Sequence, residues 1–190
     1  MALLLTACRT AHVTGPAIAP LPPAESPIEA LFARADAFPG ARSIMKVRST
    51  TGGQTRSFRA QLIVENHDRM ELIAYTPVGT TAATIRGEGD QVTVTDALTG
   101  SMIRGSASDL LGQYGFFTGG LTPAQMGMLL LGYPPRRDLV YEATASGLSR
   151  AMVGDIAVTF EPPSLPAQHV VIARGADRVE IDQLEVASMK

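Results

Sequence analysis

Alternation of apolar and polar residues, broken at hairpin-sized intervals, constrains the fold of this chain more than any other feature of its sequence. The clearest run is 55–65, where Phe58, Ala60, Leu62 and Val64 fall on one face and Arg59, Gln61 and Glu65 on the other. A period of two is typical of a strand that buries one face. Short connections join only antiparallel neighbours, so the sequence predicts an antiparallel meander.

The same pattern recurs along most of the chain. Further strands are expected at 44–50, 70–75, 80–85, 91–95, 101–104, 139–145, 156–160, 168–173 and 178–186. Glycines and prolines separate these runs, including Gly147 and Gly154 near the C-terminal strands. The total is nine to eleven strands, and one sheet of that size must curl.

Two helix starts interrupt the strand pattern with capping-box signals. Ser26 and Glu29 bracket the first start, and Thr122 and Gln125 bracket the second. Three helices are expected, over residues 27–38, 106–114 and 122–131. The last is apolar around most of its circumference, which favours deep burial over contact with an apolar ligand. The predicted fold is α+β: a curved antiparallel sheet, forming an incomplete barrel, closed by about three helices around an apolar cavity.

The N-terminal 25 residues differ from the rest. Residues 5–8 (LTAC) resemble the lipobox of bacterial lipoproteins, in which a leader is cut before a cysteine that is then lipidated. Seven residues without Lys or Arg are too few for a leader, so we expect the true start to lie upstream of Met1. A tail that matches by chance is the alternative. We therefore expect a residual lipobox at 1–8, a proline-rich tether at 9–25 and a folded domain at 26–190.

Side chains for catalysis or nucleic-acid binding are not grouped in this sequence. The 16 basic and 18 acidic residues are scattered, which gives no footprint for nucleic acid. His67 and His169 have no metal-ligating neighbours at a useful spacing, and Cys8 is the only cysteine. The sequence therefore predicts a protein that is not an enzyme and needs no cofactor.

An apolar residue occupies the tip of a predicted turn. Val78 lies between Pro77 and Gly79, at a position where loops usually carry polar groups. One interpretation is that Val78 folds back onto the sheet. The other is that it forms an exposed apolar finger that touches lipid or a partner.

Three stretches carry a resemblance to a known family. Residues 72–80 (LIAYTPVGT) are similar to the strand and Pro-Leu-Gly loop of the LolB family, which belongs to the LolA/LolB lipoprotein-carrier superfamily. Residues 109–111 (DLL) with 121–134 (LTPAQMGMLLLGYP) resemble its two helices, and 165–167 (LPA) its proline before the last strands. LolB proteins are outer-membrane lipoproteins that receive other lipoproteins from a periplasmic carrier. Their loop-tip leucine, matched here by Val78, serves insertion into the membrane.

The resemblance implies a function and a location. The expected protein is anchored in the outer membrane through lipidated Cys8, faces the periplasm, and binds acyl chains of lipoproteins or lipids. Its expected partners are acylated lipoproteins and a periplasmic LolA-like carrier. Arg9, rather than an Asp, follows the cysteine, which favours the outer membrane. The alternative is a structural or assembly lipoprotein of an envelope complex that reuses the same half-barrel without transport.

Two groups of residues are the candidate site. The membrane or cargo-insertion loop comprises Pro77, Val78 and Gly79. The expected cavity lining comprises apolar residues of the strands and the last helix: Phe58, Leu62, Leu72, Ile85, Val92, Val94, Met126, Leu129 and Leu130. A tightly packed interior would favour the assembly alternative over transport.

Overall fold

Eleven strands pair side by side in a single antiparallel sheet in the computed structural model, which describes residues 26–113 and 119–189. The strands are β1 Ala41–Thr51, β2 Gln54–Glu65, β3 Arg69–Tyr75, β4 Thr81–Glu88, β5 Gln91–Asp96, β6 Met102–Ser106, β7 Val140–Thr144, β8 Gly147–Val153, β9 Ile156–Phe160, β10 His169–Arg174 and β11 Asp177–Ser188. The helices are α1 Pro27–Asp36, α2 Ala107–Gln113 and α3 Pro123–Leu130. The predicted curved antiparallel sheet with three helices is confirmed.

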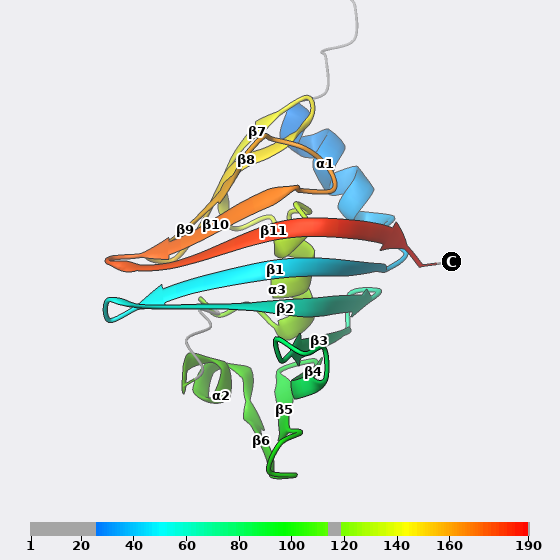
Figure 1. The fold of residues 1–190 in the computed structure, drawn as a ribbon. Helices are drawn as coiled ribbons and strands as arrows, with labels where there is room; N and C mark the ends of the chain where they lie inside the picture. The colour runs from blue at the N-terminus through cyan, green and yellow to red at the C-terminus, as the bar shows by residue number, and fades with distance from the viewer. Residues whose placement is uncertain (1–25, 114–118, 190) are drawn as a thin grey trace, which may run out of the picture.

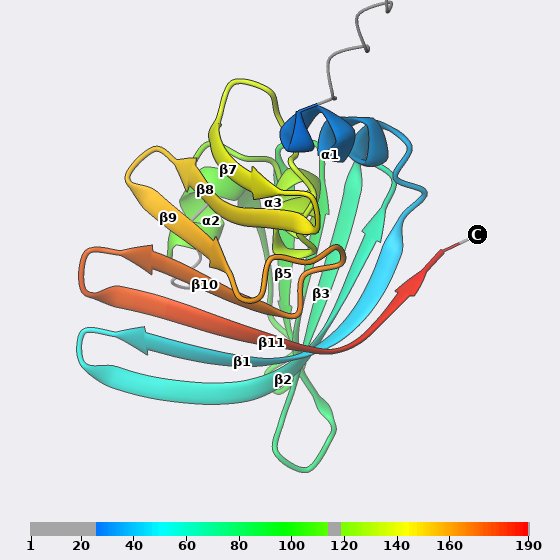
Figure 2. The same cartoon turned by 90° about the horizontal axis from the view of Figure 1, so that it is seen from above.

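The strand order is β6-β5-β4-β3-β2-β1-β11-β10-β9-β8-β7. Each strand pairs with the next strand along the chain, except that β6 does not pair with β7. Strands β6 and β7 are therefore the two edges, and β1 pairs with β11 in the middle of the sheet. The sheet therefore stays open, and it curves around α3 (Figures 1 and 2). Helix α1 contacts β7 and β8 near one edge, whereas α2 contacts β5 and β6 at the other.

The inner face of the sheet is apolar, as the alternation in the sequence predicts. Leu62 lies opposite Leu72, Leu72 opposite Ile85, and Ile85 opposite Val94, so one apolar row crosses four strands. All four side chains are buried. Since a slip of one residue would turn the whole row to solvent, this burial fixes the register.

Helix α3 packs on this inner face at very short range. A Cβ added at Gly87 would lie 2.2 Å from Cβ of Pro123, and one added at Gly127 would lie 2.5 Å from Cγ2 of Val64. Larger residues at either position would force the helix away from the sheet. Thr122 and Gln125 complete the predicted capping box, with N–H···O distances of 3.0 and 3.3 Å.

Only half of the predicted capping box forms at α1. The Ser26 hydroxyl accepts from the backbone N–H of Glu29 at 3.4 Å, as expected for an N-cap. The Glu29 carboxylate, however, accepts from Arg137 at 2.9 Å. The Arg137 guanidinium also lies 4.4 Å from the Phe32 ring centroid, so this arginine links α1 to the segment before β7.

One strand was missing from the sequence-based prediction. Gly147 and Gly154 are expected there to separate strands, but the segment between them is β8, and Gly147 is its first residue. A Cβ at Gly147 would lie 2.7 Å from the backbone of Ser164. The glycine is therefore needed for close packing rather than for ending a strand.

Candidate functional site

The loop between β3 and β4 holds its apolar tip in a defined conformation. The N–H of Gly79 donates to the carbonyl of Thr76 at 2.9 Å, and Gly79 has a φ of +89° that favours glycine. Thr76 and Thr80 close the loop through a backbone bond of 2.8 Å and a hydroxyl contact of 2.8 Å. Val78 is 85% exposed, so its side chain does not fold back onto the sheet. Contact of this tip with lipid or a partner stays a prediction.

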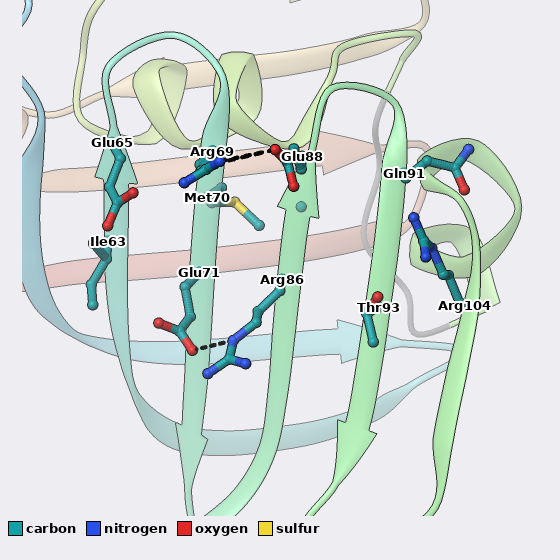
Figure 3. A pocket seen from close by; sticks show the side chains of 11 residues that line it. Ile63, Glu65, Arg69, Met70, Glu71, Arg86, Glu88, Gln91, Thr93 and Arg104 are labelled. Carbon is teal, nitrogen blue, oxygen red and sulfur yellow. Dashed lines mark hydrogen bonds and ion pairs between the residues drawn. The ribbon is translucent and has the colours of Figure 1, made fainter.

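A second apolar tip lies at the same end of the sheet. Strands β3 and β5 run in the same direction (Figure 3), so the turns that follow them lie at the same end of the sheet. Leu98, in the β5–β6 turn, is 72% exposed, and Met102 and Ile103 on β6 are 69% and 46% exposed. Ile103 lies opposite Val94 and so continues the inner-face row, whereas Met102 lies next to the turn. We call Val78, Leu98 and Met102 the apolar rim, which comprises three of the six large exposed apolar side chains of the described residues.

Asp96 organises the turn that presents Leu98. Its carboxylate accepts backbone N–H groups of Leu98 at 2.8 Å and Thr99 at 3.1 Å. Both hydrogen bonds lower the pKa of Asp96 below its usual value, and the bond from Thr99 has the larger effect. The β5–β6 tip is thus fixed by its own hydrogen bonds, like the β3–β4 tip. The sequence carried one signal for it, an apolar leucine within the turn-forming run 96–100 (DALTG), which the sequence-based prediction did not use.

The residues expected to line a cavity gather on the inner side of the sheet and on α3. Eight of the nine are buried in one apolar core: Leu62, Leu72, Ile85, Val92, Val94, Met126, Leu129 and Leu130. Phe58 is half-buried and packs against this core. Their role as an acyl-chain lining stays a prediction. Because α3 packs closely against β2 and β4, an acyl chain needs a shift of α3 to enter between them.

A groove of about 570 Å³ crosses the outer face of β2–β6 (Figure 3). Two ion pairs span it, Arg69–Glu88 at 3.1 Å and Arg86–Glu71 at 2.8 Å. Within each pair the two charges neutralise each other. Most of these side chains are exposed, so the ion pairs contribute little to the stability of the fold. The groove brings together no nucleophile and base.

The two histidines of the folded part have structural contacts. His169 Nδ1 lies 2.7 Å from Asp182, and His67 Nδ1 lies 3.2 Å from the sulfur of Met128. No group of three His, Cys, Asp or Glu side chains that could hold a metal occurs within 26–113 and 119–189. In the same residues, no helix is long and apolar enough to cross a bilayer. Cys8, the predicted lipid attachment site, lies outside the described residues.

Comparisons with known proteins identify the fold. No protein-family model matches the chain, and no curated protein matches it. Among solved structures, a putative outer membrane lipoprotein-sorting protein domain from Vibrio parahaemolyticus superposes with a TM-score of 0.59 at 8% identity, covering 86% of this chain and 91% of that one. The chain therefore shares its fold with this lipoprotein-sorting domain.

Two further structures agree with this assignment. A LolA superfamily protein from Nitrosomonas europaea has a TM-score of 0.51 at 10% identity, covering 86% of this chain and 94% of that chain. A DUF1329 family protein from Desulfovibrio piger also gives 0.51 at 10% identity, with 85% and 93% covered. The resemblance to the LolA/LolB superfamily is therefore confirmed for the fold. Identities this low carry over no residue roles.

Proposed function

We propose that this chain is a lipid-anchored envelope protein that binds acyl chains of lipoproteins or lipids and helps to insert or localise them in the outer membrane. Cys8 would carry the anchor, and a periplasmic LolA-like carrier would deliver the cargo. A cysteine with two or more chains would stay in the membrane, because each buried methylene contributes about 0.8 kcal/mol. The superfamily fold supports the acyl-binding part of the proposal.

The observation that carries the proposal is the apolar rim. Val78 and Leu98 occupy two hydrogen-bonded turns at the same end of the sheet, where most of each side chain is exposed. Clustered exposed apolar side chains usually mark contact with a membrane or a partner. Transfer of an acyl chain requires an apolar contact point of this kind at the membrane surface.

Close packing of α3 supports a second candidate function. Gly87 and Gly127 let α3 approach the sheet without leaving space for an acyl chain between them. A protein that had lost transport would keep such a packed interior. It would use the rim to hold an envelope complex together, and we keep this structural role as the alternative.

A transfer assay separates the two functions. A triacylated fluorescent lipopeptide is loaded onto the full chain carrying Cys8→Ser, and its passage to quenched vesicles is followed. Acyl transfer predicts a saturable complex and release to vesicles faster than spontaneous lipopeptide exchange. Absence of a saturable complex would leave the assembly role.

A further inference from the structure

A second groove, of about 710 Å³, lies on the outer face of the sheet directly beside the Val78 loop. Pro77 and Gly79 form one border, and Lys46 on β1 and Arg59 on β2 line the floor. Both cationic side chains are exposed. The groove therefore joins an apolar tip to two positive charges.

The two cations occupy an unfavourable arrangement for the free protein. Lys46 and Arg59 are directly opposite each other in the β1–β2 register, where like charges are destabilising. Neither forms an ion pair with a described residue. Asp182 lies opposite Lys46 on β11, but its carboxylate is 2.7 Å from His169 Nδ1.

Two other arginines on this face have acidic partners. Arg48 contacts Glu180 at 3.2 Å, and Arg86 contacts Glu71 at 2.8 Å. Arg42 and Arg104 also lie on this face without an ion pair to a described residue, but only Lys46 and Arg59 lie opposite each other beside the loop that carries Val78. An anion from outside the chain would remove their mutual repulsion.

The distance from the cations to the tip fits a lipid surface. Arg59 lies opposite Tyr75, the last residue of β3, and Val78 follows three residues later. At about 3.3 Å per residue, the tip extends at most roughly 10 Å beyond the cations. Side chains of interfacial segments reach about 5–10 Å into the headgroup and acyl boundary. With Val78 at that depth, Lys46 and Arg59 lie among the lipid phosphates.

Tyr75 also lines the groove and lies opposite Arg59. Its hydroxyl donates to Oε1 of the buried Gln61 at 3.3 Å, and the same oxygen accepts from Arg42 at 2.8 Å. These bonds hold the floor of the groove beside the two cations in place.

We propose that Lys46 and Arg59 form a phosphate-binding subsite for phospholipid headgroups, filled when the apolar rim enters the membrane. The inference rests on the proposed function and adds a ligand class and two binding residues to it. An acidic protein would also neutralise the cations. The adjoining apolar tip and its depth favour the membrane surface.

Vesicle partition of the full chain carrying Cys8→Ser tests the subsite. Lys46→Gln/Arg59→Gln is compared with Arg34→Gln/Arg150→Gln, which removes the same charge from exposed positions on α1 and β8. The vesicles contain phosphatidylcholine and phosphatidylglycerol at low salt. Each cation near such a surface contributes about fivefold in partition, so the first pair should lose about 25-fold. The control pair should lose less than about threefold, and removal of the like-charge contact should not lower the thermal midpoint of the first pair.

The outcomes separate this inference from the proposed function. Equal losses for the two pairs, or no loss for either, would overturn the subsite. Loss of transfer from an acidic carrier protein with unchanged vesicle partition would also overturn it, because the cations would then serve a protein. If Val78→Glu weakens partition while Lys46→Gln/Arg59→Gln does not, the subsite fails and the proposed function stands. If the unsubstituted rim shows no affinity for vesicles at all, the membrane role itself fails.

Discussion

The charge variant Val78→Glu should separate folding from lipid contact. Full burial of a valine side chain contributes roughly 1.5–3 kcal/mol. With 85% of Val78 exposed, its remaining contacts are worth roughly 0.2–0.5 kcal/mol. A domain of this size loses about 2–4 °C of thermal midpoint per kcal/mol, so the midpoint should fall by less than about 2 °C.

Lipid contact should respond far more strongly. A charged side chain in the acyl region costs on the order of 2–3 kcal/mol, which corresponds to a roughly 30- to 150-fold weaker vesicle partition. Flotation with phosphatidylcholine vesicles, in the Cys8→Ser background, measures this loss. Val140→Glu is the matched control, because Val140 is 67% exposed on the other edge strand, β7. A fall of many degrees in midpoint, or equal partition of both variants, would refute the reasoning.

Three further substitutions test the packing, the titration and the rim. Gly127→Ala should destabilise the fold by roughly 1–3 kcal/mol in urea, because its Cβ would lie 2.5 Å from Cγ2 of Val64; an unchanged midpoint would show that α3 is loosely held. Burial raises the pKa of Tyr141 to about 12, above the ordinary 10.0, so part of the folding stability is lost as pH rises from about 10 to 12. Tyr141→Phe should abolish this loss of stability between about pH 10 and 12. Parallel profiles of unfolding free energy against pH for the two proteins would contradict the prediction. Leu98→Glu should weaken vesicle partition further when combined with Val78→Glu. No added loss would show that the β5–β6 turn does not contact the membrane.

The sheet was predictable because local pattern and global fold agree. In β2 the alternation of the sequence matches the burial of Ala60, Leu62 and Val64. The Thr122 capping box marks the start of α3. The apolar residues around most of the circumference of this helix predict its observed burial. Strand β8 was missed because Gly147 is read locally as a break, while its reason is the distant backbone of Ser164.

The site was less predictable because it depends on register. Val78 could be picked out within a single turn, as an apolar residue between Pro77 and Gly79. The opposition of Lys46 and Arg59 follows only from the β1–β2 pairing, which places residues 13 positions apart side by side. The rim likewise needs two hairpins at one end of a sheet, which the strand order decides.

Labelling with a photoreactive fatty acid tests the central claim, acyl binding, most directly. The full chain is loaded with the probe, irradiated and digested, and the modified residues are located by mass spectrometry. The account predicts saturable labelling on β2, β3 and α3, at inner-face positions such as Leu62, Leu72 and Leu129. Labelling confined to the apolar rim, or none competed by unlabelled fatty acid, would contradict it.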